Sequence, residues 1–439
     1  MKTRISGFYK IILSVALAVL TVISVSAEIF AQGLSEDKLV KYAEDIVEYE
    51  KKFLDIPHGE SLFSGEFLEY AGQDSADWFV IGISRMGLNE DFESYYYAFA
   101  DNIIKNNTES TRATDWQRYT LTALSCGGDP RDINGVNALE NGAYIDENID
   151  GQGLNSWIWA LIAINSWDFE SKDSYRDIED RENKIIDKIL LSQLDDGGFA
   201  LSGDKGDCDL TAMAVQALAA HRHQREDVNS GVEKALDFLS GKISEGSADS
   251  CESVAQLICA LCSADIDFKS DERFNAGEDL LETLIQYRNP DGGFSHIKGG
   301  ESDPLSSSQA LLALAAVYRY ENGENRLYDF KENFSPRTYK FDNVSENQSE
   351  INDINAEIMQ ELYPFEKLDT KQKKRLEKLY ERVLKLPESD RKKITGYEEM
   401  KEICESGSSV KTAVLAVVIV VILLFAVIIF IKRFKGEKK

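Results

Sequence analysis

The chain has 439 residues, which is enough for one large domain or for two to three of ordinary size. Its 76 acidic residues outnumber its 49 basic residues, so the formal net charge is -27 at pH 7. A surface of this sign repels phosphate backbones, and the composition therefore argues against nucleic acid as a partner.

The first 27 residues have the pattern of a secretory signal peptide. Lys2, Arg4 and Lys10 precede an apolar run from Ile11 to Val25. A small residue, Ala27, follows this run and marks the expected cleavage site. The sequence therefore predicts an exported protein.

A second apolar segment lies near the other end of the chain. Residues 412–431 carry no charge, and the basic residues of 432–439 follow them. About twenty apolar residues span a bilayer, and flanking Lys and Arg favour the cytoplasmic side. We therefore expect a single transmembrane helix, a cytoplasmic basic tail, and a cell-membrane protein whose folded part is extracellular.

Residues 36–332 are predicted to form an all-α domain of six helix pairs. The apolar residues recur with the period of a helix, and strand-like alternation is nearly absent. Alternate helices begin at Asp, Ser or Asn, which are good N-caps, and are apolar nearly all round. The expected helices are 39–54, 75–87, 92–105, 113–126, 133–143, 153–166, 178–193, 208–221, 229–240, 250–264, 275–287 and 304–320.

Helices that are apolar all round must be covered on both sides. An inner ring of apolar helices inside an outer ring, an α6/α6 toroid, satisfies this requirement, and an open solenoid is the alternative. Three of the apolar helices also carry a glutamine at matching places, namely Gln216, Gln256 and Gln309.

The same turn precedes two of these helices, as "LDDGGF" at 194–199 and "NPDGGF" at 289–294. We expect its glycine to end one helix in a left-handed conformation and its phenylalanine to pack beneath the next helix. The repeated turn and the capped helices resemble the α/α-toroid of squalene cyclases and protein prenyltransferases, a toroid that transcobalamin and intrinsic factor share. The chain is similar to exported bacterial proteins with prenyltransferase-type repeats over about residues 40–330.

The resemblance also points to an acid site. Class II terpene cyclases have an Asp-x-Asp-Asp-Thr-Ala motif whose middle Asp protonates an alkene, and residues 207–212 read "DCDLTA". Asp209 matches the acid, Asp207 matches the first Asp, and Leu210 replaces the last one. Alkene protonation requires a carboxyl group that stays protonated. The alternative, which the sister repeats favour, is that Asp207 and Asp209 only cap the following helix.

Metal binding is not expected. Protein prenyltransferases bind zinc through Asp, Cys and His, but their Asp-x-Cys spacing is not reproduced here. We therefore predict no metal and no cofactor.

Four tryptophans lie near the starts of the apolar helices. Trp78, Trp116, Trp157 and Trp159 are expected either to line a ligand pocket at one mouth of the ring, together with Asp207 and Asp209, or to fill the core.

After a linker at 333–349, residues 350–405 are predicted to form a small three-helix module, with a single bent stalk as the alternative. Pro364 and Pro387 separate its amphipathic patterns. The expected apolar faces are Leu376, Leu379, Val383, Leu384 and Leu386, and Ile394, Tyr397, Met400 and Ile403.

The sequence as a whole favours a membrane-anchored extracellular toroid that binds an unidentified small molecule or cell-surface partner without catalysis. A terpene cyclase with a reduced acid site is the second hypothesis, and a purely structural surface protein is the third.

Overall fold

The computed structural model describes residues 36–106, 111–169, 178–275, 279–332, 334–341, 347–363, 365 and 368–405. The predicted signal peptide, transmembrane helix and basic tail lie outside these residues. Within the described part of the chain, no helix has both the length and the apolar character needed to cross a membrane.

The all-α prediction is confirmed for the described residues, in which helices are joined by loops and the only β-type pairs are isolated bridges. Contacts divide the chain into two units. Among the described residues, the ring unit comprises those within 36–130, 138–169 and 180–337, and the C-terminal unit comprises those within 131–137, 178–179 and 338–405.

The helices of the ring unit follow the predicted order. They are α2 (Glu36–Phe53), η1 (Gly65–Tyr70), α3 (Asp74–Met86), α4 (Phe92–Asn106), α5 (Ala113–Ser125), α6 (Ala138–Ala143), α7 (Asp146–Asp150), α8 (Gly153–Asn165), α9 (Ile178–Leu190), α10 (Cys208–Leu218), η2 (Ala219–His221), α11 (Glu226–Ser244), α12 (Cys251–Ser263), α13 (Leu280–Ile285) and α14 (Pro304–Glu321).

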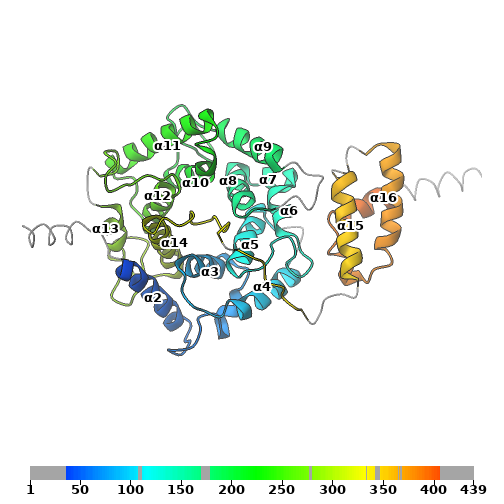
Figure 1. The fold of residues 1–439 in the computed structure, drawn as a ribbon, viewed down its shortest axis with the longest axis horizontal. Helices are drawn as coiled ribbons and strands as arrows, with labels where there is room; N and C mark the ends of the chain where they lie inside the picture. The colour runs from blue at the N-terminus through cyan, green and yellow to red at the C-terminus, as the bar shows by residue number, and fades with distance from the viewer. Residues whose placement is uncertain are drawn as a thin grey trace, which may run out of the picture. The chain divides into compact units, whose positions relative to one another are not determined.

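Six of these helices contact one another in a closed ring. α3 packs on α5, α5 on α8, α8 on α10, α10 on α12 and α12 on α14, and α14 returns to α3. Figure 1 shows these six helices inside, with α2, α4, α6, α7, α9, α11 and α13 around them. The first and last inner helices, α3 and α14, therefore contact each other directly.

Two helices are only about half as long in the structure as predicted. The stretch expected at 133–143 begins instead with a turn, because Asn134 and Gly135 have φ values of 50° and 89°, and α6 starts only at Ala138. The stretch expected at 275–287 is reduced to α13, whose N-cap Asp279 accepts a hydrogen bond from the backbone N–H of Leu281.

The repeated Asp-Gly-Gly-Phe turn has the predicted conformation in both copies. Gly197 and Gly292 adopt φ values of +88° and +96°, in the region that favours glycine. Each also lies against the backbone of an outer helix. A Cβ atom on Gly197 would be 2.6 Å from the carbonyl oxygen of Lys234, and one on Gly292 would be 2.6 Å from that of Asp45. The turn before α10 therefore packs against α11, and the turn before α14 packs against α2.

The phenylalanine of each turn is fully buried, as predicted. The backbone N–H of Phe199 donates to Thr211 Oγ1 of α10, and that of Phe294 donates to Ser307 Oγ of α14, both at 2.9 Å. Each hydroxyl lies four residues after its helix N-cap, Asp207 or Asp303. The two turns are thus structural equivalents.

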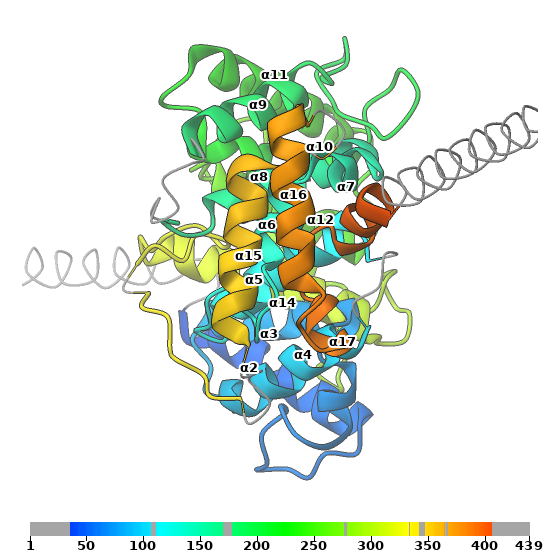
Figure 2. The same ribbon diagram turned by 90° about the vertical axis from the view of Figure 1, so that its right-hand side faces the viewer.

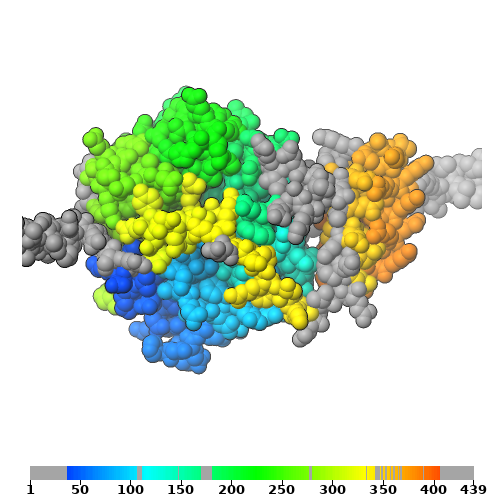
Figure 3. All heavy atoms as spheres, in the orientation of Figure 1, coloured from blue at the N-terminus to red at the C-terminus, as the bar shows by residue number. Residues whose placement is uncertain are grey.

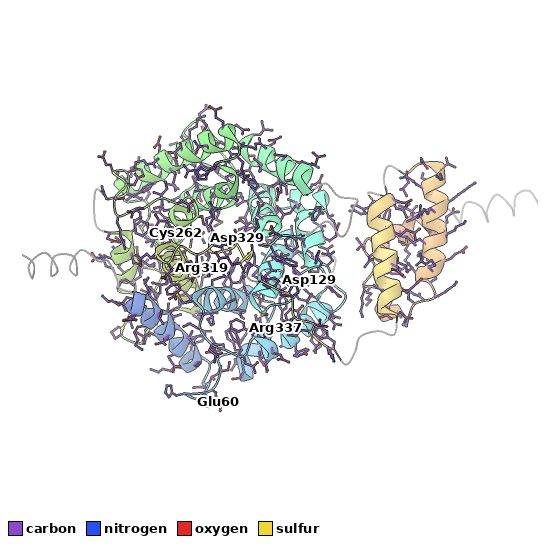
Figure 4. The ribbon with its side chains drawn as sticks, in the orientation of Figure 1. Glu60, Asp129, Cys262, Arg319, Asp329 and Arg337 are labelled. Carbon is purple, nitrogen blue, oxygen red and sulfur yellow. The ribbon has the colours of Figure 1, made fainter. Side chains whose placement is uncertain are left out.

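A C-terminal strap, residues 324–332 and 334–337, covers one end of the ring. Phe330 N–H donates to Ser166 O after α8 (2.6 Å), and Arg337 N–H donates to Gly127 O after α5 (2.8 Å). Arg85, in the last turn of α3, donates to the carbonyl oxygens of Arg326 and Asp329. Figure 3 shows this segment in yellow across the face of the ring, and Figure 4 places Arg319 and Asp329 towards its centre. The strap therefore closes the end at which the inner helices finish.

The C-terminal unit contains α15 (Gln348–Glu361), α16 (Thr370–Val383), α17 (Glu388–Arg391) and a helix over residues 397–405. α15 and α16 lie side by side (Figure 2). Their core includes Leu376, Leu379, Val383, Leu386, Ile394 and Met400, with Tyr397 and Ile403 packed against it. Leu384 does not belong to this core, because its position at the end of α16 leaves it 43% exposed.

Candidate acid site at the start of α10

Asp207 and Asp209 have different roles in the structure. Asp207 is the N-cap of α10, and its Oδ1 accepts a hydrogen bond from the backbone N–H of Leu210 at 2.8 Å. Asp209 lies in the first turn and does not cap the helix. The capping hypothesis is therefore correct for Asp207 only. A cap of this kind contributes about 1 kcal/mol to the free energy of unfolding, and here that contribution comes from Asp207.

The carboxyl group of Asp209 lies in surroundings that favour its protonated form. It is partly buried, and its Oδ1 has no hydrogen-bond partner among the described residues. Burial raises the pKa of Asp209, and a hydrogen bond with Ser253 offsets this only in part. The negative charges of Asp207, Glu252 and Asp249 raise the pKa further. This is the electrostatic environment that a proton-donating carboxyl group requires.

Two of these charges come from the neighbouring helix and its N-terminal loop. Glu252 lies two residues after Ser250, the N-cap of α12, as Asp209 lies two residues after the N-cap of α10. Sequence reasoning missed Glu252 and Asp249. Asp209 and Glu252 lie at the same distance from the N-caps of consecutive inner helices. This equal spacing could have identified Glu252 from the sequence.

Glu252 is itself paired and ionised. Although burial opposes ionisation, hydrogen bonds from Ser306 and His296 lower the pKa of Glu252. Ser306 Oγ donates to Glu252 Oε1 at 2.6 Å, and His296 Nδ1 lies 2.8 Å from Glu252 Oε2. The hydrogen bond to Glu252 also raises the pKa of His296. Glu252 therefore contributes a fixed negative charge beside Asp209.

Asp209 shares a helix face with Met213 and Gln216, because residues four and seven positions apart lie above one another on a helix. Gln216 Nε2 donates to Gln256 Oε1 of α12 at 2.9 Å, and Gln256 Nε2 donates to Gln309 Oε1 of α14 at 2.8 Å. Counted from the N-caps, Gln256 and Gln309 lie six residues into their helices, whereas Gln216 lies nine residues into α10. We call these three residues the glutamine ladder.

On α12, Cys259 lies three residues after Gln256 and therefore on the same helix face. Burial raises the pKa of the phenol of Tyr328 in the strap, and Cys259 adds to this effect. Tyr328 packs against Trp159 of α8 with ring centroids 5.5 Å apart. Trp159 in turn meets Trp78 of α3 at 5.2 Å. Since α5 separates α3 from α8 in the ring, these two tryptophans meet across its interior.

The other two tryptophans predicted to bind a ligand lie elsewhere. Trp157 donates from Nε1 to Asp150 Oδ1 at 3.1 Å and lies under the cationic groups of Arg181 and Lys188 of α9. Trp116 packs edge-on against Tyr119 at 5.5 Å. The structure therefore brings Trp78 and Trp159 together inside the ring, and it does not bring Trp116 and Trp157 to them.

Part of the chain is similar to a known terpene-forming enzyme. Over 141 residues, which are 31% of this chain and 26% of the relative, the sequence is 31% identical to drimenyl diphosphate synthase from Streptomyces showdoensis. The chain thus matches only about a quarter of that protein. No family model and no solved structure matches the chain. The partial match, together with the all-helical structure, fits a terpene-cyclase-like fold.

Proposed function

We propose that the ring unit is an α6/α6 toroid of the terpene-cyclase type and that it is an enzyme. The closed ring of six inner helices, the surrounding outer helices and the partial similarity to drimenyl diphosphate synthase support this proposal. The proposed substrate class is an isoprenoid with carbon–carbon double bonds, and the proposed reaction is its cyclisation.

The proposal rests mainly on the surroundings of the Asp209 carboxyl group. Asp207 already caps the helix, so Asp209 is not needed for that purpose. Its pKa is raised by burial and by three neighbouring carboxylates, and one of its oxygens has no partner among the described residues. Leu210 replaces a carboxylate of the cyclase motif, but Glu252 and Asp249 supply negative charge from the adjacent helix and loop. A general acid of this kind typically contributes a factor of about 10² to 10⁴ in rate.

In the proposed reaction, the protonated carboxyl group of Asp209 transfers its proton to one carbon of a double bond. The π electrons of that bond form the new C–H bond, the carboxyl group becomes a carboxylate, and the other carbon becomes a cation. A second double bond of the substrate attacks this cation and closes a ring. Loss of a proton to a base ends the reaction, so the product is an isomer of the substrate.

The ring interior suits a cationic intermediate. Trp78, Trp159 and Tyr328 present aromatic rings there, and the faces of such rings attract cations. Their apolar surface also suits a hydrocarbon chain. In this proposal Trp78 and Trp159 keep the ligand-binding role that the sequence suggested for them.

Turnover by purified full-length protein tests the proposal. Linear isoprenoid alkenes, with and without a diphosphate group, are incubated with the wild type, and cyclic products are measured by gas chromatography and mass spectrometry. We expect cyclic products from the wild type and a loss of about 10²- to 10⁴-fold in Asp209→Asn. The amide cannot donate a proton of comparable acidity, although it has nearly the same shape.

The same substitution at Asp279, the N-cap of α13, is the control, because asparagine still caps a helix and the site is far from α10 in sequence. Asp279→Asn should retain wild-type turnover. Full activity of Asp209→Asn would exclude the acid role. If no isoprenoid gives a product but a ligand shifts tryptophan fluorescence, the ring unit is a binding module instead.

We further propose that the protein is exported and anchored in the cell membrane by residues 412–431, with the ring unit outside. The uncharged segment and the basic residues after it support this orientation. Protease added to intact cells should release a soluble fragment that contains the ring unit. Resistance of that unit until the membrane is permeabilised would contradict the proposed orientation.

A further inference from the structure

The glutamine ladder ends in an acceptor without a partner. Gln216 is only 7% exposed, and its Oε1 has no hydrogen-bond partner among the described residues. Its Nε2 is occupied by Gln256 Oε1 and lies 3.5 Å from Ala212 O, so the amide is oriented with its oxygen free. A buried carbonyl oxygen left without a donor costs about 1–3 kcal/mol of desolvation. A ligand that supplies a donor would recover this free energy.

The position of this oxygen relates it to the acid site. Gln216 lies on the face of α10 that carries Asp209, two turns further into the helix, and Met213 lies between them. Met213 is half-buried, and an unbranched methionine changes its rotamer easily. A chain that enters past Asp209 and displaces the Met213 side chain would therefore reach Gln216.

The charges around Asp209 restrict what can enter. We define the acidic rim as Asp207, Asp209, Asp249, Glu252 and Asp303. Asp207, Asp249 and Glu252 interact electrostatically with Asp209, and Asp303 interacts with His296 and Cys251, as Glu252 does. Two basic residues beside the rim are already paired: His296 pairs with Glu252, and Lys242, which interacts with Cys208 of α10, pairs with Glu245. A diphosphate brought to this rim would meet like charges, and it offers no proton to Gln216 at neutral pH.

We propose that the substrate is an uncharged isoprenoid alcohol, that its hydroxyl group donates a hydrogen bond to Gln216 Oε1, and that the acidic rim excludes isoprenoid diphosphates. This inference rests on the proposed cyclase function and specifies its substrate class. The preferred substrate therefore differs in charge from the diphosphate in the name of the partial relative.

Binding to the Asp209→Asn full-length protein tests the inference, since this variant is expected to turn its ligand over about 10²- to 10⁴-fold more slowly than the wild type. Farnesol, the hydrocarbon β-farnesene and farnesyl diphosphate, the last with and without Mg²⁺, are titrated while tryptophan fluorescence is followed. We expect farnesol to bind about fivefold to tenfold more tightly than β-farnesene, as one hydrogen bond of about 1 kcal/mol implies. Farnesyl diphosphate should bind more weakly than either, and added salt should strengthen its binding by screening the rim.

Gln216→Met, made in the same background, should abolish the preference for farnesol, because methionine fills a similar volume without the acceptor. Gln309→Met shortens the ladder at its other end and leaves the Gln216 oxygen in place, so it should keep the preference. A melting temperature for each variant shows whether it is folded.

Equal affinity of the parent protein for farnesol and β-farnesene would overturn the inference, whatever the variants do. Tighter binding of farnesyl diphosphate would overturn it as well. These binding results are independent of turnover.

The two proposals can therefore fail separately. Asp209-dependent cyclisation of a diphosphate would keep the proposed function and refute the alcohol as substrate. The expected binding pattern without any turnover would refute only the acid chemistry.

Discussion

Gly292→Ala is expected to destabilise the ring unit by about 3 kcal/mol or more. The φ value of +96° is strained for alanine, which costs on the order of 1–3 kcal/mol by itself. The new Cβ would also lie 2.6 Å from the carbonyl oxygen of Asp45 and 3.2 Å from its carbonyl carbon. These are backbone atoms of α2, so the clash cannot be relieved by a side-chain rotation. The free energy of unfolding, measured by urea denaturation of the full chain, checks this expectation.

Gly299 is a matched control for this substitution. It lies in the same loop with a φ value of +78°, and nothing stands within 4 Å of a Cβ atom there. Gly299→Ala should therefore cost only the backbone strain. All five tryptophans, Trp78, Trp116, Trp157, Trp159 and Trp167, belong to the ring unit, so intrinsic fluorescence follows the unfolding of that unit alone. Equal destabilisation by the two substitutions would show that the turn does not depend on its contact with α2.

Glu50→Gln is expected to stabilise the ring unit above neutral pH. Glu50 of α2 is 4% exposed, and its Oε2 has no partner among the described residues. Burial raises its pKa from 4.5 to about 7. Because the folded state holds this proton more tightly than the unfolded state, the stability that the neutral group confers is complete below pH 4.5 and is lost as the pH rises to about 7. A shift of this size corresponds to on the order of 3 kcal/mol.

The difference in unfolding free energy between Glu50→Gln and the wild type should therefore be near zero at pH 4.5 and reach its full value above pH 7. Glu48 on the same helix is the control. A hydrogen bond from His58 lowers the pKa of Glu48, so Glu48→Gln should not stabilise the protein at any pH in this range. A difference for Glu50→Gln that does not change between pH 4.5 and pH 8 would mean that Glu50 is not protonated in the folded protein.

Local features of the fold could be predicted from the sequence because a few residues determine them. Ser250 and Asp303 are N-caps in the structure, and Gly197 and Gly292 have the left-handed conformation expected from the repeated turn. These features depend on the hydrogen bonds and backbone dihedrals of adjacent residues. The contact between α14 and α3 could not be predicted in the same way, because it depends on the angles between all the inner helices that lie between them in the chain.

The candidate site was only partly predictable. Asp207 and Asp209 both lie at the start of α10, and the sequence does not say which carboxylate reaches the N–H of Leu210. The environment of Asp209 depends on Glu252 of another helix. Helix geometry alone separates two of the tryptophans predicted to bind a ligand, because Trp157 and Trp159 are two residues apart on α8 and point to opposite sides of it. They could not both have lined one mouth of the ring.

The contacts that close the ring also determine when it can fold. Arg288 and Asp45 form an ion pair 2.5 Å long, and Arg85 binds the Asp329 carbonyl oxygen at 2.8 Å, although these pairs are separated by 243 and 244 residues. Contacts between such distant residues form slowly, since a long loop must close before they stabilise anything. During synthesis, the apolar side of α3 that later receives α14 remains uncovered until α14 and the strap have been made. We expect this period to be the time at which the chain is most prone to aggregate.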